Sequence, residues 1–222
     1  MNEPSQQVAG KAESGSPTEG RLFVVAAPSG AGKTSLVNAL VARDPRLEIS
    51  VSFTTRAPRP GERDGVHYHF TTPEAFRQRQ AQGEFLEHAE VFGNFYGTHR
   101  QTTREILAGG RDLILEIDWQ GARQIKAAFP QCDSVFILPP SLATLHERLG
   151  ARAQDSDAVI QSRMDKARAE ISHCREFDFV IVNDDFDTAL NELRAMVAHC
   201  RDGKAFKQRP VDQLLAELME SG

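Results

Sequence analysis

The sequence lacks a long hydrophobic run, an excess of positive charge and a closely spaced set of cysteines. No apolar stretch among its 222 residues approaches the roughly 18 residues that span a bilayer, and the N-terminus has no signal-peptide core. Its 26 Lys and Arg stand against 31 Asp and Glu, a net charge of -5 that argues against nucleic acid or an anionic membrane as the main partner. We therefore expect a cytoplasmic protein that binds neither membrane nor nucleic acid.

Cysteine is scarce as well. The three residues Cys132, Cys174 and Cys200 lie far apart, are odd in number and include no C-x-x-C pair. Such spacing gives no disulfide framework and no zinc-ligand pattern. We expect reduced thiols.

Apolar residues make up 40% of the chain, enough for the core of one domain. Residues 1–20 are rich in Gly, Ser, Glu, Gln and Pro, so we expect a disordered tail. From Arg21 onward, short apolar strands alternate with helical patterns, which predicts an α/β fold: a parallel sheet with helices on both faces. Alternating polarity over 49–54 predicts one further strand. The stretch of about 52–98 is rich in hairpin signals and aromatics, which predicts a subdomain inserted between core strands.

One stretch joins the first apolar strand, 22–26, to a helical pattern: Ala27-Pro28-Ser29-Gly30-Ala31-Gly32-Lys33-Thr34, followed by Ser35. The glycines, lysine and threonine have the offsets of a phosphate-binding loop, or P-loop. In such a loop, backbone N–H groups face an anion, the lysine reaches the outer phosphates and the hydroxyl binds Mg²⁺. Ala27 replaces the first glycine, so the strict pattern fails at that position. The alternative is a glycine turn that only begins a helix.

Two further clusters suit anionic ligands. Arg56, Arg59, Tyr68 and Tyr96 lie in the inserted stretch, and two prolines restrict how the arginines point. Guanidinium groups match phosphate oxygens bidentately, which predicts a site for a second phosphate; surface arginines in water are the alternative. The other cluster consists of Arg148, Arg152 and Arg163, for which a solvated charged helix is the alternative.

Glu116 and Asp118 lie at the end of the apolar strand 113–118 and resemble the acid that supports Mg²⁺ in P-loop enzymes. Helix capping or a solvated strand end is the alternative. Thr34 and Asp118 are our predicted metal ligands.

Four separate signatures around the P-loop resemble the guanylate kinase family: residues 50–62, 95–98, 118–121 and 181–184. They occur in the order and spacing of that family, and the resemblance covers about residues 21–201. It implies a core of 21–51, 99–140 and 170–222, a GMP-binding subdomain of about 52–98, and a lid of about 141–169 over ATP.

The resemblance also implies a role for each matching residue. ATP would be bound by residues 27–35 and by Asn183 on the adenine side. GMP would be bound by Ser52, Arg56, Arg59, Glu62, Tyr68, Glu87, Tyr96, Thr98 and Asp118. Catalysis would depend on Lys33, Arg56, Arg148, Arg152 and Arg163. Of these, Ser52, Glu87 and Thr98 would contact the guanine base. This assignment also has chemical sense, because a carboxylate such as Glu87 accepts from both N1–H and N2–H of guanine, which adenine does not offer in that arrangement.

The implied activity is transfer of the γ-phosphoryl group of Mg-ATP to GMP or dGMP, within purine nucleotide metabolism. The first alternative is a binding module of the same family that has lost catalysis, although such a module is expected to lose the P-loop lysine or the GMP-site residues. The second is a P-loop kinase for another nucleoside monophosphate. The amphipathic end, 211–219, could pack on the core or join another subunit, so a homo-oligomer is one of the alternatives.

Overall fold

The computed structural model describes residues 19–91, 93–150 and 157–220. Within these residues, the larger sheet has five parallel strands in the order β2-β7-β1-β8-β9. Their bounds are β1 Leu22–Ala26, β2 Leu47–Ile49, β7 Asp112–Glu116, β8 Asp133–Leu138 and β9 Phe179–Val182. The central β1 is fully buried, and it lies between β7 and β8. Whatever follows β1 therefore lies at the middle of the carboxyl edge, where ligands bind in such sheets.

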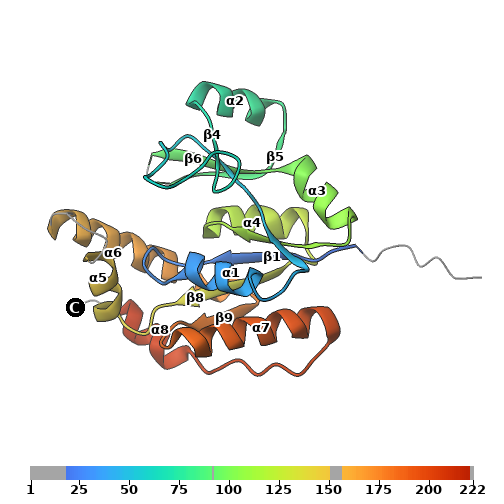
Figure 1. Ribbon diagram of the computed structural model, residues 1–222. Helices are drawn as coiled ribbons and strands as arrows, with labels where there is room; N and C mark the ends of the chain where they lie inside the picture. Colours follow the sequence, from blue (N-terminus) through green and yellow to red (C-terminus); the bar gives the residue numbers. More distant parts are fainter. Residues whose placement is uncertain (1–18, 92, 151–156, 221–222) are drawn as a thin grey trace, which may run out of the picture.

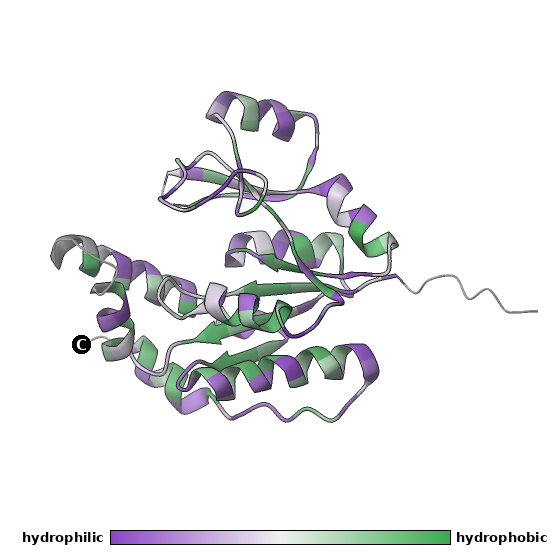
Figure 2. Ribbon diagram, in the orientation of Figure 1, coloured by the Kyte–Doolittle hydropathy of each residue, from purple (hydrophilic) through white to green (hydrophobic). Residues whose placement is uncertain are grey.

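Helices cover both faces of this sheet, which confirms the predicted fold class (Figure 1). One face packs against α1 and α7, and the other against α3, α4 and α8. The bounds are α1 Lys33–Val41, α3 Arg100–Ala108, α4 Trp119–Ala128, α7 Phe186–Asp202 and α8 Asp212–Met219. The strands are the most continuously hydrophobic part of the chain (Figure 2), as expected when both faces are covered. Leu215 and Leu218 of α8 are buried in the core, so this amphipathic end packs on its own chain.

A smaller sheet lies above the first one in Figure 1, with strand order β4-β3-β6-β5. It comprises β3 Phe53–Thr54, β4 His69–Phe70, β5 Phe85–Val91 and β6 Asn94–His99, together with helix α2 Pro73–Ala81. The rings of Phe76 and Phe85 stack at 4.4 Å and fill the space under Gly97, where a Cβ would lie 2.9 Å from Phe85. Gly97 is therefore required for this aromatic core.

The single strand predicted over 49–54 was wrong. Ile49 pairs with Ile114 in the larger sheet, whereas Phe53 pairs with Gly97 in the smaller one. The chain passes from one sheet to the other at 50–52. Alternating polarity reports which faces are buried and carries no information about which sheet the strand joins, so one pattern covered two strands.

Two helices, α5 Leu142–Gly150 and α6 Asp157–Ile171, follow β8 and share a small apolar cluster of their own. Leu145 and Leu149 of α5 pack there against Ile160 and Met164 of α6. A short 3₁₀ helix, η1 Cys174–Glu176, connects α6 to β9. None of the helices in the described ranges is both long and apolar enough to cross a membrane. All three cysteines are free thiols, as expected.

A buried arginine holds the edge of the larger sheet. The Arg201 side chain on α7 is 6% exposed and forms hydrogen-bonded ion pairs with Asp44, before β2, and Asp112, at the start of β7. Removing Arg201 takes the shared charged partner from both carboxylates and leaves Asp112, whose side chain is 10% exposed, with the hydrogen bond from the Arg21 backbone. We expect Arg201→Ala to lower the free energy of unfolding by about 3 kcal/mol, measured by urea denaturation. Arg194→Ala, at an exposed position of the same helix, should change it by less than about 0.5 kcal/mol.

Candidate nucleotide-binding site

The glycine loop leaves β1 at the centre of the carboxyl edge and begins α1. Gly30 and Gly32 have φ values of +90° and +91°, a backbone conformation that other residues rarely adopt. Ala27 packs against the apolar core beneath α1 and α7. A methyl group is therefore accommodated where the strict pattern has glycine. Lys33 and Thr34 follow as the first two residues of α1.

Glu116, the last residue of β7, faces the P-loop. Its Oε2 accepts a hydrogen bond from Thr34 Oγ1 at 3.0 Å and lies 3.3 Å from Lys33 Nζ. Asp118 caps α4 instead, because its Oδ1 accepts from the backbone N–H of Gly121 at 2.9 Å. The two acids that the sequence grouped together thus have different partners, and Glu116 is the one in contact with the predicted metal ligand Thr34.

Asn183 follows β9 and lies under the P-loop. Its side-chain Nδ2 donates to the carbonyl of Ala31 at 2.7 Å, and the residue is 4% exposed. The direct partner of this amide is the loop backbone. The adenine contact stays a prediction.

In the cluster predicted to bind a second phosphate, Glu62 contacts both arginines. Both oxygens of Glu62 accept from Arg56 Nη2, at 2.8 and 2.9 Å, and Oε2 also accepts from the backbone N–H of Arg59 at 2.7 Å. The Arg56 hydrogen bond lowers the pKa of Glu62, so this carboxylate stays ionised. Arg56 lies 5.3 Å over the Tyr68 ring, which meets the Tyr96 ring edge-on at 6.1 Å. Arg56, Tyr68 and Tyr96 from separate segments therefore lie close together, and the phosphate site stays a prediction.

Glu87 of β5 is the most deeply buried acid of this region, at 3% exposure. Its Oε1 accepts from the hydroxyl of Thr98, a fully buried residue of β6, at 2.7 Å. Burial raises the pKa of Glu87 to about 7. Its other oxygen lies over the first turn of α4, where a Cβ on Gly121 would be 2.5 Å away. The carboxylate has a fixed position between β6 and α4.

One cavity of about 270 Å³ extends from the P-loop to Arg59, Tyr68, Tyr96 and Glu87. Its lining includes the sequence-predicted residues Ala27, Ser29, Lys33, Ser52, Arg59, Tyr68, Glu87, Tyr96 and Asp118. Glu62 holds the Arg56 side chain and the Arg59 backbone beside this cavity, and the Thr98 hydroxyl donates to Glu87. The cavity thus has the P-loop at one end and the hydrogen-bonding carboxyl group of Glu87 at the other.

The same cavity contains a residue that sequence reasoning missed. Glu170, in the last turn of α6, lines it together with Ser29 and Lys33. Burial raises the pKa of Glu170 to about 7, although a hydrogen bond from the Ser29 backbone opposes that rise. No local motif marks this glutamate, because its position depends on how α6 packs against the loop.

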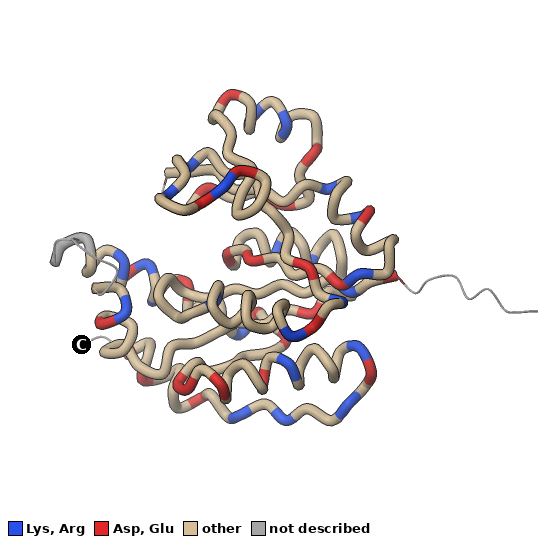
Figure 3. The backbone as a smooth tube through the Cα atoms, in the orientation of Figure 1, with Lys and Arg blue, Asp and Glu red and all other residues tan. Residues whose placement is uncertain are grey.

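The three predicted lid arginines have different settings. Arg148 of α5 donates from Nη2 to the backbone carbonyl of Asn183 at 3.3 Å, and its buried Nη1 has no hydrogen-bond partner among the described residues. Arg163 lies on α6, a helix with several Lys and Arg residues along its length (Figure 3). Arg152 lies outside the described residues. The roles of all three stay predictions.

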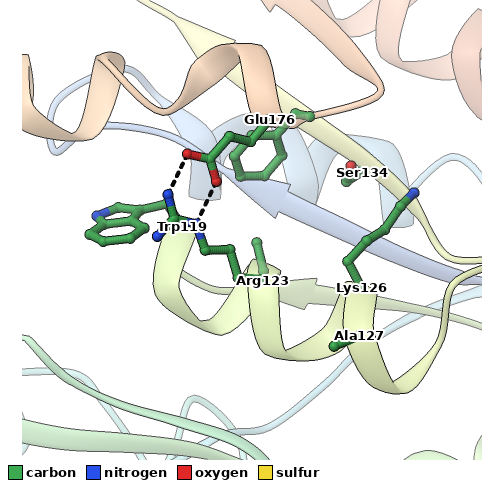
Figure 4. A pocket seen from close by; sticks show the side chains of 8 residues that line it. Trp119, Arg123, Lys126, Ala127, Ser134 and Glu176 are labelled. Atoms are coloured by element: carbon green, nitrogen blue, oxygen red, sulfur yellow. Dashed lines mark hydrogen bonds and ion pairs between the residues drawn. The ribbon is translucent and has the colours of Figure 1, made fainter.

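A second cavity, of about 330 Å³, lies between α4 and the segment 174–177 (Figure 4). Arg123 crosses it to form two hydrogen bonds of 2.6 Å with Glu176, and it stacks over Trp119 at 4.5 Å. Trp119 in turn stacks on His173 at 3.7 Å. These pairings tie α4 to the chain that follows α6, and they account for Trp119 as a packing residue.

The fold and the site together define a P-loop protein of the nucleoside monophosphate kinase class: a parallel sheet with the P-loop after its central strand, facing a cluster of arginine and tyrosine side chains across one cavity. A family model described as guanylate kinase matches residues 19–200. The chain belongs to the guanylate kinase family.

Individual relatives agree with this family. The chain is 54% identical over 201 residues to a guanylate kinase of Nitrosococcus oceani, covering 90% of this chain and 99% of that protein. It is 56% identical over 200 residues to one of Alkalilimnicola ehrlichii, covering 90% and 97%. A crystal structure of guanylate kinase from Anaplasma phagocytophilum matches with a TM-score of 0.70 and 33% identity, over 92% of this chain and 98% of that one. These relatives support a guanylate kinase function.

Proposed function

We propose that the protein transfers the γ-phosphoryl group of Mg-ATP to GMP, giving ADP and GDP. The observation that carries the proposal is the cavity that holds the P-loop at one end and the buried Glu87–Thr98 pair at the other. A carboxylate there can accept from N1–H and N2–H of guanine, while Arg56, Arg59, Tyr68 and Tyr96 can bind the phosphate of the same nucleotide.

The residues at the P-loop fit Mg²⁺. The Thr34 hydroxyl and the Glu116 carboxylate are hard oxygen donors already in contact with each other, which is the ligand type that Mg²⁺ prefers. Their contact favours Glu116 over Asp118 as the carboxylate of a metal site. When bound, Mg²⁺ would neutralise charge on the donor phosphates.

The protein's own part is to bring two anions together and to exclude water. Lys33 lies beside Glu116 at the donor end, and Arg56 lies at the acceptor end. No general base is needed, because a phosphate monoester with a second pKa near 6 is mostly dianionic at neutral pH. We propose that the arginines of α5 and α6 offset the charge of the transferring group, as an arginine finger does.

A coupled assay of ADP release with GMP, dGMP, AMP, CMP and UMP tests the proposal. We expect turnover with GMP and dGMP and kcat/KM values for the other acceptors that are lower by at least about 10³. Equal or better turnover of AMP would contradict the guanine assignment and favour a kinase for another monophosphate. Absence of turnover with all five, with GMP still bound, would favour the non-catalytic binding module.

The apparent affinity for GMP should fall as the pH drops below about 7. The Glu87 pKa is raised to about 7 by burial, and only the ionised form accepts from both guanine N–H groups. We expect KM for GMP to rise toward tenfold per pH unit on the acid side, and to level off above pH 8. Glu87→Gln removes this titration, so its KM, although higher, should lose that step. A step of the same size in Glu87→Gln would assign the titration to another group.

A further inference from the structure

One hydrogen bond fixes the backbone of the P-loop from below. Asn183 Nδ2 donates to the carbonyl of Ala31 at 2.7 Å, across 152 positions of sequence. The Asn183 backbone is itself held, because its N–H continues the β8–β9 ladder by donating to Leu138 at 2.8 Å. The amide group is therefore mounted on the rigid end of a buried strand.

This contact sets the direction of the next peptide N–H. The carbonyl of Ala31 and the N–H of Gly32 belong to one planar trans peptide and point in opposite directions. When the carbonyl points down to Asn183, the Gly32 N–H points away from it, into the concave side of the loop where an anion binds. Gly32, at φ +91°, tolerates conformations that other residues do not, so its own backbone would resist a peptide flip weakly.

The space around Gly32 also indicates that Asn183 supports the backbone of the P-loop. A Cβ at this position would lie 2.3 Å from Asn183 Nδ2. The amide thus fills the volume directly under the glycine. At 4% exposure, and with Nδ2 occupied by Ala31, the side chain has little surface to offer to a purine base.

We propose that Asn183 is a positioning residue for phosphoryl transfer, which acts through the Ala31 carbonyl to hold the Gly32 N–H toward the donor phosphates. The same residue meets the lid, because Arg148 donates to its backbone carbonyl at 3.3 Å. The proposal rests on the donor site described above and gives Asn183 a role that does not depend on the base of the donor nucleotide.

The test compares ligands with and without a base. We would measure the affinity of the full-length protein and of Asn183→Ala for ATP and for inorganic triphosphate by calorimetry. Loss of one positioned hydrogen bond should weaken both about tenfold, by the same factor. KM for ATP and for CTP as donors should also rise by one common factor, with the affinity for GMP unchanged. Asp187→Ala, at an exposed position four residues later, should leave all of these values as they are.

The outcomes separate the possible failures. If Asn183→Ala weakens ATP but leaves inorganic triphosphate at the native affinity, Asn183 contacts adenine and the proposal is overturned. Unchanged affinity for both ligands also overturns it. If the native protein binds neither, the donor site itself is wrong. Should Asn183→Ala not fold, Asn183→Asp serves in its place, because it keeps the shape of the side chain and replaces the donor with an acceptor. Equal weakening of ATP and inorganic triphosphate in that variant supports the proposal, and weakening of ATP alone overturns it.

Discussion

Lys33→Ala should lower kcat by about 10³ while GMP binding stays measurable. Lys33 is the second-to-last residue of the P-loop motif, and its ammonium group lies 3.3 Å from Glu116, at the donor end of the cavity. A point charge at this place stabilises the outer phosphates most when charge moves between them, so the loss falls mainly on kcat. Steady-state kinetics with saturating GMP, together with calorimetric titration of GMP, measure the two quantities separately.

A matched control is available in Lys207→Ala, at an exposed position after α7. It removes the same charge from the protein and should leave kcat within a factor of two, since an exposed side chain far from the loop has no part in the chemistry. Near-native turnover of Lys33→Ala would refute the role of the P-loop. Loss of GMP binding in that variant would instead mean that Lys33 holds the acceptor end.

The fold was predictable where local patterns and global architecture agree. Buried apolar strands at 22–26, 113–118 and 134–138 could be predicted because both faces of a parallel strand are covered. The boundary between the two sheets was not readable. Ile49 and Phe53 obey one alternation although they pair with different sheets, because pairing depends on residues far away in the sequence.

Some residues of the candidate site could be predicted from the sequence and others could not. Lys33 and Thr34 were found from their spacing alone, whereas Glu87 and Thr98 were assigned from the family resemblance. Glu170 was not found, since a glutamate on an amphipathic helix gives no signal until α6 is packed against the loop. The partner of Asn183 could not be predicted either, because its contact with Ala31 joins residues 152 positions apart in the sequence.

Glu87→Ala should lower kcat/KM for GMP by about 10³ and leave the affinity for ATP unchanged. The carboxylate is 3% exposed, and in the proposed complex it accepts two hydrogen bonds from guanine, each worth about 1.5–3 kcal/mol when one partner is charged. Its removal would also leave the buried Thr98 hydroxyl without its acceptor. Glu87→Gln keeps the shape and one acceptor, so we expect a smaller loss, of about 10². Competition between GMP and AMP in one assay measures the change in base selectivity directly.

Two further variants separate the chemistry of Glu87 from its surroundings. Glu74→Gln, at an exposed position on α2, replaces a carboxylate outside the cavity and should leave GMP kinetics unchanged. Gly121→Ala keeps the Glu87 carboxylate but places a Cβ 2.5 Å from its Oε2, so the carboxylate must shift. We expect it to weaken GMP and not ATP, because a purine edge is read only by acceptors at the right position. If selectivity for GMP over AMP survives in both Glu87→Ala and Gly121→Ala, guanine is recognised by other groups, and Ser52 and Thr98 are then the remaining predicted contacts to the base.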